Sequence, residues 1–212
     1  MEARLAARLA RYGRLVLEAN RSFNLTGAKT AAEFALHLLD SLHVVPFLAG
    51  DSLVDVGSGA GLPAIPVALA TGVRVTLIEP TRKKAHFLEH AIETLELRGE
   101  VVAERAEVAA RDDRLRDRFS SGTARAVSTA PTVAELVLPF VQPEGVAILQ
   151  RGATDARERA ALADAALMLA ARVEEEHLLE GERRIFLVRK SGATPLRFPR
   201  RTGIPEKRPL CM

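Results

Sequence analysis

Three glycines at alternate positions mark the stretch of the sequence with the clearest chemical use. Gly57, Gly59 and Gly61 follow an apolar run that contains Asp55, and a helical pattern begins directly after them. Glycine permits tight turns and lets the backbone approach a ligand closely, and parallel sheets bind ligands where strands lead into helices. Dinucleotide-binding folds favour the spacing G-x-G-x-x-G, which places a pyrophosphate on a helix N-terminus. The spacing here is G-x-G-x-G, so we predict a ligand-binding turn of a different kind.

An acidic residue follows the next apolar run. Glu79 comes 18 residues after Gly61, at the end of a strand predicted over 73–78. A carboxylate at this point is well placed to accept hydrogen bonds from ribose hydroxyls. Ala106 and Glu107 follow the third apolar run, where nucleoside-binding α/β folds usually contact the adenine. Together these positions predict a site for an adenosine-containing ligand.

These motifs lie in a chain whose short apolar runs alternate with helical patterns. Strands are predicted over 52–56, 73–78, 101–103, 124–128, 146–149 and 184–189. Helices are predicted over 4–20, 31–42, from the glycine loop to 70, and over 82–97, 133–141 and 156–172. The alternation predicts an α/β fold, a mostly parallel, doubly wound sheet covered on both faces. The Pro-rich stretch 194–209 is expected to lack regular structure.

Length and composition suit one soluble α/β domain with short additions. The 212 residues divide into an N-terminal helical extension (1–45), a ligand-binding domain (46–192) and a basic Pro/Arg-rich tail (193–212). The single cysteine, Cys211, excludes a disulfide framework and indicates a reducing cytoplasm. No apolar run is long enough to span a bilayer, so no membrane partner is expected.

The positive charge is concentrated at one end of the chain. The net charge is only +3, but residues 181–212 carry nine Lys or Arg against two acidic residues. Such asymmetry indicates a polyanionic partner, and the alternative is a solvated basic tail. The five histidines offer only the pair His86 and His90 at helical spacing, which we attribute to coincidence on a helix surface. No metal is expected.

Two further segments are more distinctive than the glycine loop. They are His37-Leu38-Leu39-Asp40-Ser41-Leu42 and the tail from Phe198 to Leu210. With residues 55–63, 82–88, 105–107 and 124–126, they resemble the glucose-inhibited-division-B family of small-subunit (16S) ribosomal RNA guanine-N7 methyltransferases. The resemblance covers roughly residues 11–210. It implies a Rossmann-like class I methyltransferase fold.

The resemblance also implies S-adenosyl-L-methionine as cofactor and small-subunit ribosomal RNA as partner, in a bacterial cytoplasmic monomer. The cofactor-binding residues it implies are Asp55, Gly57, Ser58, Gly59, Gly61, Leu62, Glu79, Pro80, Thr81, Ala106, Glu107 and Arg125. The RNA-binding candidates are Arg105, Arg151, Arg200, Arg201, Lys207 and Arg208. The chain departs from the family pattern at Leu36, Ala64 and Glu104, among other positions.

The chemistry that the resemblance implies requires no catalytic base. Guanine N7 carries a free lone pair and takes no part in Watson–Crick pairing, so no proton has to leave before the new bond forms. Positioning would then supply most of the rate, with Arg125 orienting the substrate. Three alternatives remain: a methyltransferase of a protein or small molecule, an NAD-binding oxidoreductase, and an RNA-binding module without activity.

Overall fold

A mixed β-sheet lies at the centre of the computed structural model, which describes residues 2–125 and 128–212. Its seven strands lie in the order β3-β2-β1-β4-β5-β7-β6. The strands are β1 (Ser52–Val56), β2 (Arg74–Ile78), β3 (Gly99–Val102), β4 (Phe119–Arg125), β5 (Val141–Arg151), β6 (Ala171–Leu178) and β7 (Arg184–Lys190). The first five pair in parallel, while β7 runs antiparallel between β5 and β6. The predicted mostly parallel α/β fold is confirmed.

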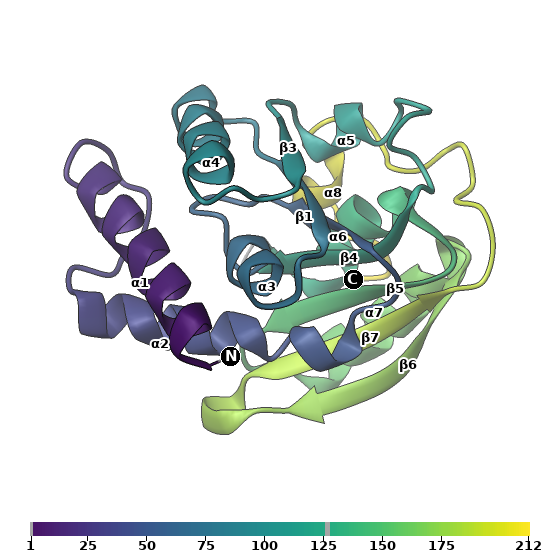
Figure 1. The fold of residues 1–212 in the computed structure, drawn as a ribbon. Helices are drawn as coiled ribbons and strands as arrows, with labels where there is room; N and C mark the ends of the chain where they lie inside the picture. The colour runs from purple at the N-terminus through teal and green to yellow at the C-terminus, as the bar shows by residue number, and fades with distance from the viewer. Residues whose placement is uncertain (1, 126–127) are drawn as a thin grey trace.

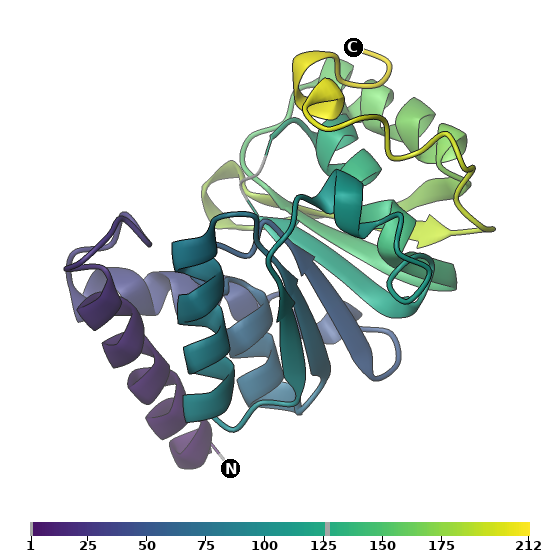
Figure 2. The ribbon, with the colours of Figure 1, turned by 90° about the horizontal axis from the view of Figure 1, so that it is seen from above.

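Helices cover both faces of the sheet, as Figures 1 and 2 show. One face carries α3 (Ala64–Thr71) and α4 (Arg82–Thr94), with α1 (Glu2–Ala19) and α2 (Ala31–Leu42) outside them. The other face carries α5 (Ala106–Ala109), α6 (Ala130–Val137), α7 (Ala156–Met168) and α8 (Ile204–Lys207). Three 3₁₀ turns complete the elements: η1 (Val45–Phe47), η2 (Leu138–Phe140) and η3 (Glu180–Glu182).

Two apolar cores, one on each face, hold these layers together. Successive strand side chains point to opposite faces, so Val54 and Val56 join the core under α6, whereas Leu53 joins the core under α3. All three side chains are at most 2% exposed. Burial on both faces explains why residues 53–56 of β1 read as an apolar run interrupted only by Asp55.

The N-terminal helices pack on the sheet domain through the same core as α3 and α4. Thr30 caps α2 by accepting a hydrogen bond from Glu33 N at 3.2 Å. The rings of Tyr12 and Phe34 meet edge to face with their centroids 5.7 Å apart. The Tyr12 hydroxyl donates to the carbonyl oxygen of Ala60 at 2.5 Å, which attaches α1 to the glycine loop. The division at residues 45 and 46 stays a prediction.

The C-terminal tail lies along the α6 face of the sheet and is anchored in its core. Phe198 and Leu210 are buried in the core there. The Arg116 guanidinium donates to the carbonyl oxygens of Thr194 at 2.9 Å and Phe198 at 3.0 Å. The expectation that this stretch lacks regular structure is wrong at α8, where Ile204 to Lys207 form one helical turn.

Several predicted boundaries are also wrong. Strand β4 begins at Phe119, not at residue 124, and the predicted strand over 124–128 extends into residues 126 and 127, outside the described residues. Helix α6 begins at Ala130 because Pro131 suits a first turn, and it ends before Pro139. Strand β6 was not predicted, because its exposed Glu174, Glu175 and Glu176 hide the pattern of an edge strand.

Candidate functional site

The glycine loop lies at the carboxyl edge of the sheet, between β1 and α3. Gly57, Gly59 and Gly61 all have positive φ angles, of 71°, 56° and 93°. A Cβ atom on Gly61 would lie 2.4 Å from Cδ1 of Ile65, so any side chain there would clash. Ala64, where the resemblance leads one to expect glycine, is buried in the first turn of α3. The loop therefore needs glycine for its turn and for the packing of α3.

Asp55 is a buried carboxyl group directly beneath this loop. Its side chain is fully buried, and neither carboxylate oxygen has a hydrogen-bond partner among the described residues. Burial raises the pKa of Asp55 to about 8 against the lowering effect of the nearby Ser58 side chain, and the neighbouring charge of Glu79 adds to the rise. Burying an unpaired carboxylate is costly unless a cation or donor pairs with it. Asp55 is thus an unsatisfied acceptor at the base of the site.

Glu79 joins the glycine loop to the end of β2. One carboxylate oxygen accepts from Gly59 N at 2.9 Å and the other accepts from Thr81 N at 2.8 Å. The side chain is buried, with 4% exposed. Each carboxylate oxygen can accept more than one hydrogen bond, so Glu79 keeps capacity for ribose hydroxyls. It holds the loop in place and remains able to bind a ligand.

Two hollows meet at Gly57. One is lined by Pro80, Ala106 and Glu107 together with Arg105 and the tail residue Glu206, among others. The other is lined by Thr26, His37, Ser58, Gly59, Leu62 and Arg125, among others. The predicted cofactor residues around Gly57 are therefore brought together, and an elongated ligand could occupy both hollows.

The tail contributes to the first hollow through Glu107. Gly203 N donates to a Glu107 carboxylate oxygen at 2.8 Å, and Arg105 pairs with the same oxygen at 3.3 Å. Burial alone would raise the pKa of Glu107, but the hydrogen bonds from Gly203 and Arg105 hold it below its usual value. The tail is thus part of the wall of this hollow.

Arg125, at the end of β4, is held by α2. Its guanidinium donates to Nδ1 of His37 at 2.9 Å and pairs with the Asp40 carboxylate at 3.4 Å. Burial and the adjacent Arg125 charge lower the pKa of His37, which keeps the ring neutral and able to accept. Because i and i+3 residues share a helix face, the H-x-x-D spacing accounts for both contacts.

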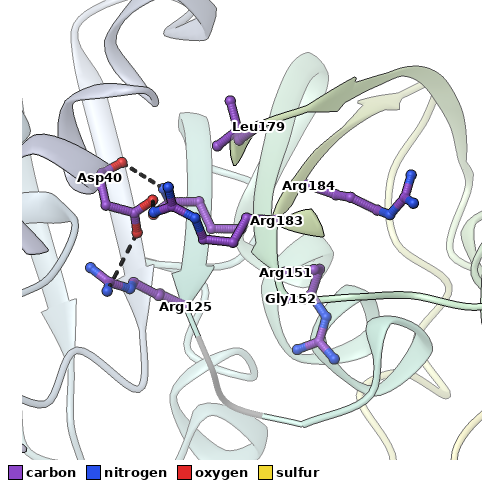
Figure 3. A pocket seen from close by; sticks show the side chains of 8 residues that line it. Asp40, Arg125, Arg151, Gly152, Leu179, Arg183 and Arg184 are labelled. Carbon is purple, nitrogen blue, oxygen red and sulfur yellow. Dashed lines mark hydrogen bonds and ion pairs between the residues drawn. The ribbon is translucent and has the colours of Figure 1, made fainter. Parts of the chain in front are cut away.

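A third cavity lies on the other side of Arg125, over β4, β5 and the start of β7. Figure 3 shows Arg125 and Arg183 converging on Asp40, while Arg151 and Arg184 point away from it. Asp40 forms ion pairs with both Arg125 and Arg183. Arg183 and Gln150, which also lines the cavity, were missed at the sequence level because no local pattern singles them out.

The RNA-binding candidates fall into two groups. Arg105, Arg151 and Arg200 are held in ion pairs, with Arg200 making contacts down to 2.6 Å to Glu135, whose side chain is fully buried. Arg201, Lys207 and Arg208 have exposed side chains on the tail. The ion pairs attach the first group to the fold, and the second group offers exposed charge; the RNA-binding role of both groups stays a prediction.

Residues 2–125 and 128–212, which the structure describes, contain neither a membrane-spanning helix nor a metal-binding cluster. No helix among them is long and apolar enough to cross a membrane. In that same part of the chain, no three His, Cys, Asp or Glu side chains are grouped so that they could hold a metal ion.

Solved structures share this fold. An O-methyltransferase from Bacillus cereus in complex with SAH superposes with a TM-score of 0.60 at 19% identity, covering 85% of this chain and 91% of that one. The O-methyltransferase TomG from Streptomyces achromogenes, in complex with SAM, gives a TM-score of 0.57 at 17% identity, covering 85% and 90%. These likenesses establish a class I methyltransferase fold.

Sequence comparison is more specific. The protein from Pelotomaculum thermopropionicum named ribosomal RNA small subunit methyltransferase G is 40% identical over 94% of this chain and 88% of its own length. The protein of the same name from Deinococcus deserti is 39% identical, over 92% and 85%. A family model described as GidB, rRNA small subunit methyltransferase G, matches residues 5–186. The chain therefore belongs to the GidB family of small-subunit ribosomal RNA methyltransferases.

Proposed function

We propose that this protein transfers the methyl group of S-adenosyl-L-methionine to N7 of a guanine in 16S small-subunit ribosomal RNA. The observation that carries the proposal is the unpaired Asp55 carboxyl beneath the glycine loop, whose Gly57 borders both hollows. The relatives named ribosomal RNA small subunit methyltransferase G support the choice of substrate.

The residues present fit this cofactor. Asp55 offers an unpaired carboxyl, suited to the cationic amino-acid part of the ligand, and Gly57 leaves room for close approach. Glu79 would accept from the ribose hydroxyls, and Ala106 and Glu107 would border the adenine. When bound, S-adenosylmethionine would supply a methyl group already activated by its sulfonium.

The acceptor side of the site needs orientation rather than proton transfer. Guanine N7 has a free lone pair, so no side chain has to remove a proton from it. Arg125 borders the cofactor hollow and is fixed by His37 and Asp40, which suits a residue that orients the acceptor. We assign Arg125 a contact with guanine O6 or the neighbouring phosphate, leaving N7 free to react.

The exposed cations of the tail would supply contacts to the RNA backbone. Arg201, Lys207 and Arg208 have exposed side chains on the segment that also borders the first hollow through Glu206. Phosphate contacts of this kind position an RNA without reading its sequence. The proposal includes action as a monomer in the cytoplasm, where Cys211 would stay reduced.

Incubation with labelled S-adenosylmethionine and unmodified small-subunit ribosomal RNA tests the proposal. Nucleoside analysis of the digested RNA should show label in N7-methylguanosine. Total protein and a duplex RNA of unrelated sequence serve as competing acceptors in parallel reactions. Label in a protein, or in a different nucleoside, would contradict the assigned substrate.

A further inference from the structure

The cavity in Figure 3 lies next to the cofactor hollows on the same carboxyl edge of the sheet. Arg125 borders both the hollow over the glycine loop and this cavity. The two hollows lie over β1 and β2, and the cavity lies beside them over β4, β5 and β7. If the cofactor occupies the two hollows, as the proposed function requires, the cavity is the adjoining space open to an acceptor.

Gln150 is the unexplained group in this cavity. Its side chain is 95% buried, and its Nε2 donates to the backbone carbonyl oxygen of Asp40 at 2.9 Å. That hydrogen bond fixes the orientation of the amide, so Oε1 faces the other way. Oε1 has no hydrogen-bond partner among the described residues. Buried polar atoms are nearly always paired, so an unpaired acceptor on a residue that lines the cavity points to a ligand that donates.

The other polar groups of the cavity include both hydrogen-bond acceptors and hydrogen-bond donors. Asp40 supplies a carboxylate, which is shared between the guanidinium groups of Arg125 and Arg183. The Nε atoms of Arg151 and Arg184 are buried donors without partners among the described residues. Four arginine side chains line the cavity and would attract a phosphate group, but a phosphodiester presents only acceptors and cannot donate to the Asp40 carboxylate or to Gln150 Oε1. The wall instead suits a ligand with donors and acceptors side by side.

A guanine base has that pattern. Its Watson–Crick edge presents two neighbouring donors, N1–H and the 2-amino group, next to the acceptor O6, and N7 lies beside O6 on the adjoining edge. Enzymes that modify a base commonly bind it unstacked and read its Watson–Crick edge. Arg183 comes from the turn before β7 and is partly exposed, so its planar guanidinium is also available for stacking.

We propose that this cavity is the guanine pocket, in which Asp40 and Gln150 accept from N1–H and the 2-amino group and Arg125 donates to O6. This inference rests on the proposed function for its choice of a guanine acceptor. It extends that function by naming residues that select guanine over other bases. It also gives Asp40 a second role besides holding Arg125.

Nucleotide binding tests the pocket without any methyl transfer. GMP, IMP and AMP are titrated into ¹⁵N-labelled protein, and the arginine Nε–H and glutamine amide signals are followed by NMR. IMP lacks the 2-amino donor, and AMP lacks N1–H and O6 as well. Losing one hydrogen bond to a buried acceptor should weaken IMP about 5- to 10-fold relative to GMP, and AMP should bind more weakly still.

A matched pair of variants tests whether Gln150 Oε1 causes the preference for GMP over IMP. Gln150→Leu keeps the size of the side chain but removes Oε1, so the preference for GMP over IMP should shrink towards equality. Gln142→Leu, at an exposed position of the same strand, should leave the preference intact. If the Gln150 variant folds poorly, the comparison of GMP, IMP and AMP in the native protein still tests the pocket.

Several outcomes would overturn the guanine pocket. They are equal affinity for the three nucleotides, no shift of these signals up to about 10 mM GMP, and displacement of GMP by inorganic phosphate at equal concentration. The last result would make the cavity an anion site. The nucleotide-binding measurement is independent of the methylation assay. Guanine selectivity without methylated RNA would sink the proposed function alone, and methylated RNA without guanine selectivity would sink the pocket alone.

Discussion

Nδ1 of His37 accepts a hydrogen bond from the guanidinium of Arg125 across 2.9 Å, which joins the second helix to the end of the fourth strand. Asp40, on the same face of that helix, pairs with the same guanidinium. The distinctive H-x-x-D segment of the sequence therefore acts on the site through Arg125.

Replacement of Arg125 should affect turnover far more than cofactor affinity. Arg125→Ala removes the group that we propose orients the acceptor, so we expect turnover to fall by about 100-fold or more at saturating cofactor. Binding of S-adenosylhomocysteine, measured by calorimetry, should remain detectable. Arg74→Ala, at the opposite edge of the sheet, is the control. Lost cofactor affinity with unchanged turnover would reassign Arg125 to the cofactor.

The contact between His37 and Arg125 should give activity an acid limit. Burial and Arg125 lower the pKa of His37, so the neutral ring persists well below the usual value of 6.5. Protonation would remove the acceptor and bring two cations together. The contact is therefore fully present above 6.5 and is lost as pH falls through the lowered pKa. We expect kcat/KM to fall across that range, and His37→Gln to show a flatter acid limb. A variant that keeps the native acid limb would place the titration elsewhere.

Asp55 should make the stability of the free protein fall as pH rises. Its folded-state pKa is about 8, above the unfolded value of 3.8. The folded state therefore binds more protons between these values, and its stability is greatest below 3.8 and declines up to about 8. Asp55→Asn should remove this part of the pH dependence and be more stable at pH 8 by at least about 1 kcal/mol. Denaturant titrations at pH 6 and 8 measure the difference. Parallel pH profiles for both proteins would show that Asp55 titrates normally.

The same carboxyl should release a proton when the cofactor binds. Because its pKa is raised to about 8, Asp55 is mostly protonated in the free protein at pH 7. A ligand cation beside it favours the charged form and lowers the pKa. Calorimetry in buffers of different ionisation enthalpy should detect proton release at pH 7, which Asp55→Asn should abolish. Proton uptake on binding would exclude a cation at this carboxyl.

Two neighbouring arginines of the tail should differ sharply in their effect on stability. Arg200→Ala leaves the fully buried Glu135 carboxylate without its ion pair, which should cost about 3–5 kcal/mol. Arg201 is exposed, so Arg201→Ala should change the free energy of unfolding by less than about 0.5 kcal/mol. Urea unfolding compares the two. Equal effects would contradict the structural role of Arg200.

The exposed cations of the tail should set the salt dependence of RNA binding. Replacing all three residues, Arg201, Lys207 and Arg208, by glutamine should make the slope of log K against log salt, where K is the RNA association constant, less negative by about 2–3. This change is expected for three lost phosphate contacts. Affinity is measured at several salt concentrations. Truncation is unsuitable because Phe198 and Leu210 are part of the core. An unchanged slope would remove the tail from the RNA surface.

The features that the sequence predicted best are those that depend on local patterns. The glycine spacing, the Glu79 position and the helix over Ala31–Leu42 can be read from neighbouring residues, and the structure has them there. Strand β6 escaped prediction because an edge strand needs no continuous apolar run.

Long-range pairings were not predictable. Gly203 N contacts Glu107, 96 residues away, and Arg183 contacts Asp40, 143 residues away. The sequence shows a basic tail, but only the fold reveals that Arg200 pairs with Glu135 while Arg201 faces solvent. The same charge pattern is compatible with either outcome. For that reason the roles of the arginines in RNA binding stay predictions.

The contact between Gly203 and Glu107 bears on the order in which the protein matures. Synthesis proceeds from the N-terminus, so the glycine loop and all seven strands emerge before the tail segment with Gly203, which binds the Glu107 carboxylate. Phe198 and Leu210, which lie in the core on that side, also follow all seven strands in the chain. Until that segment is made, the growing chain lacks one wall of the hollow lined by Ala106 and Glu107, so we expect this hollow to be complete only after the whole sheet has been made.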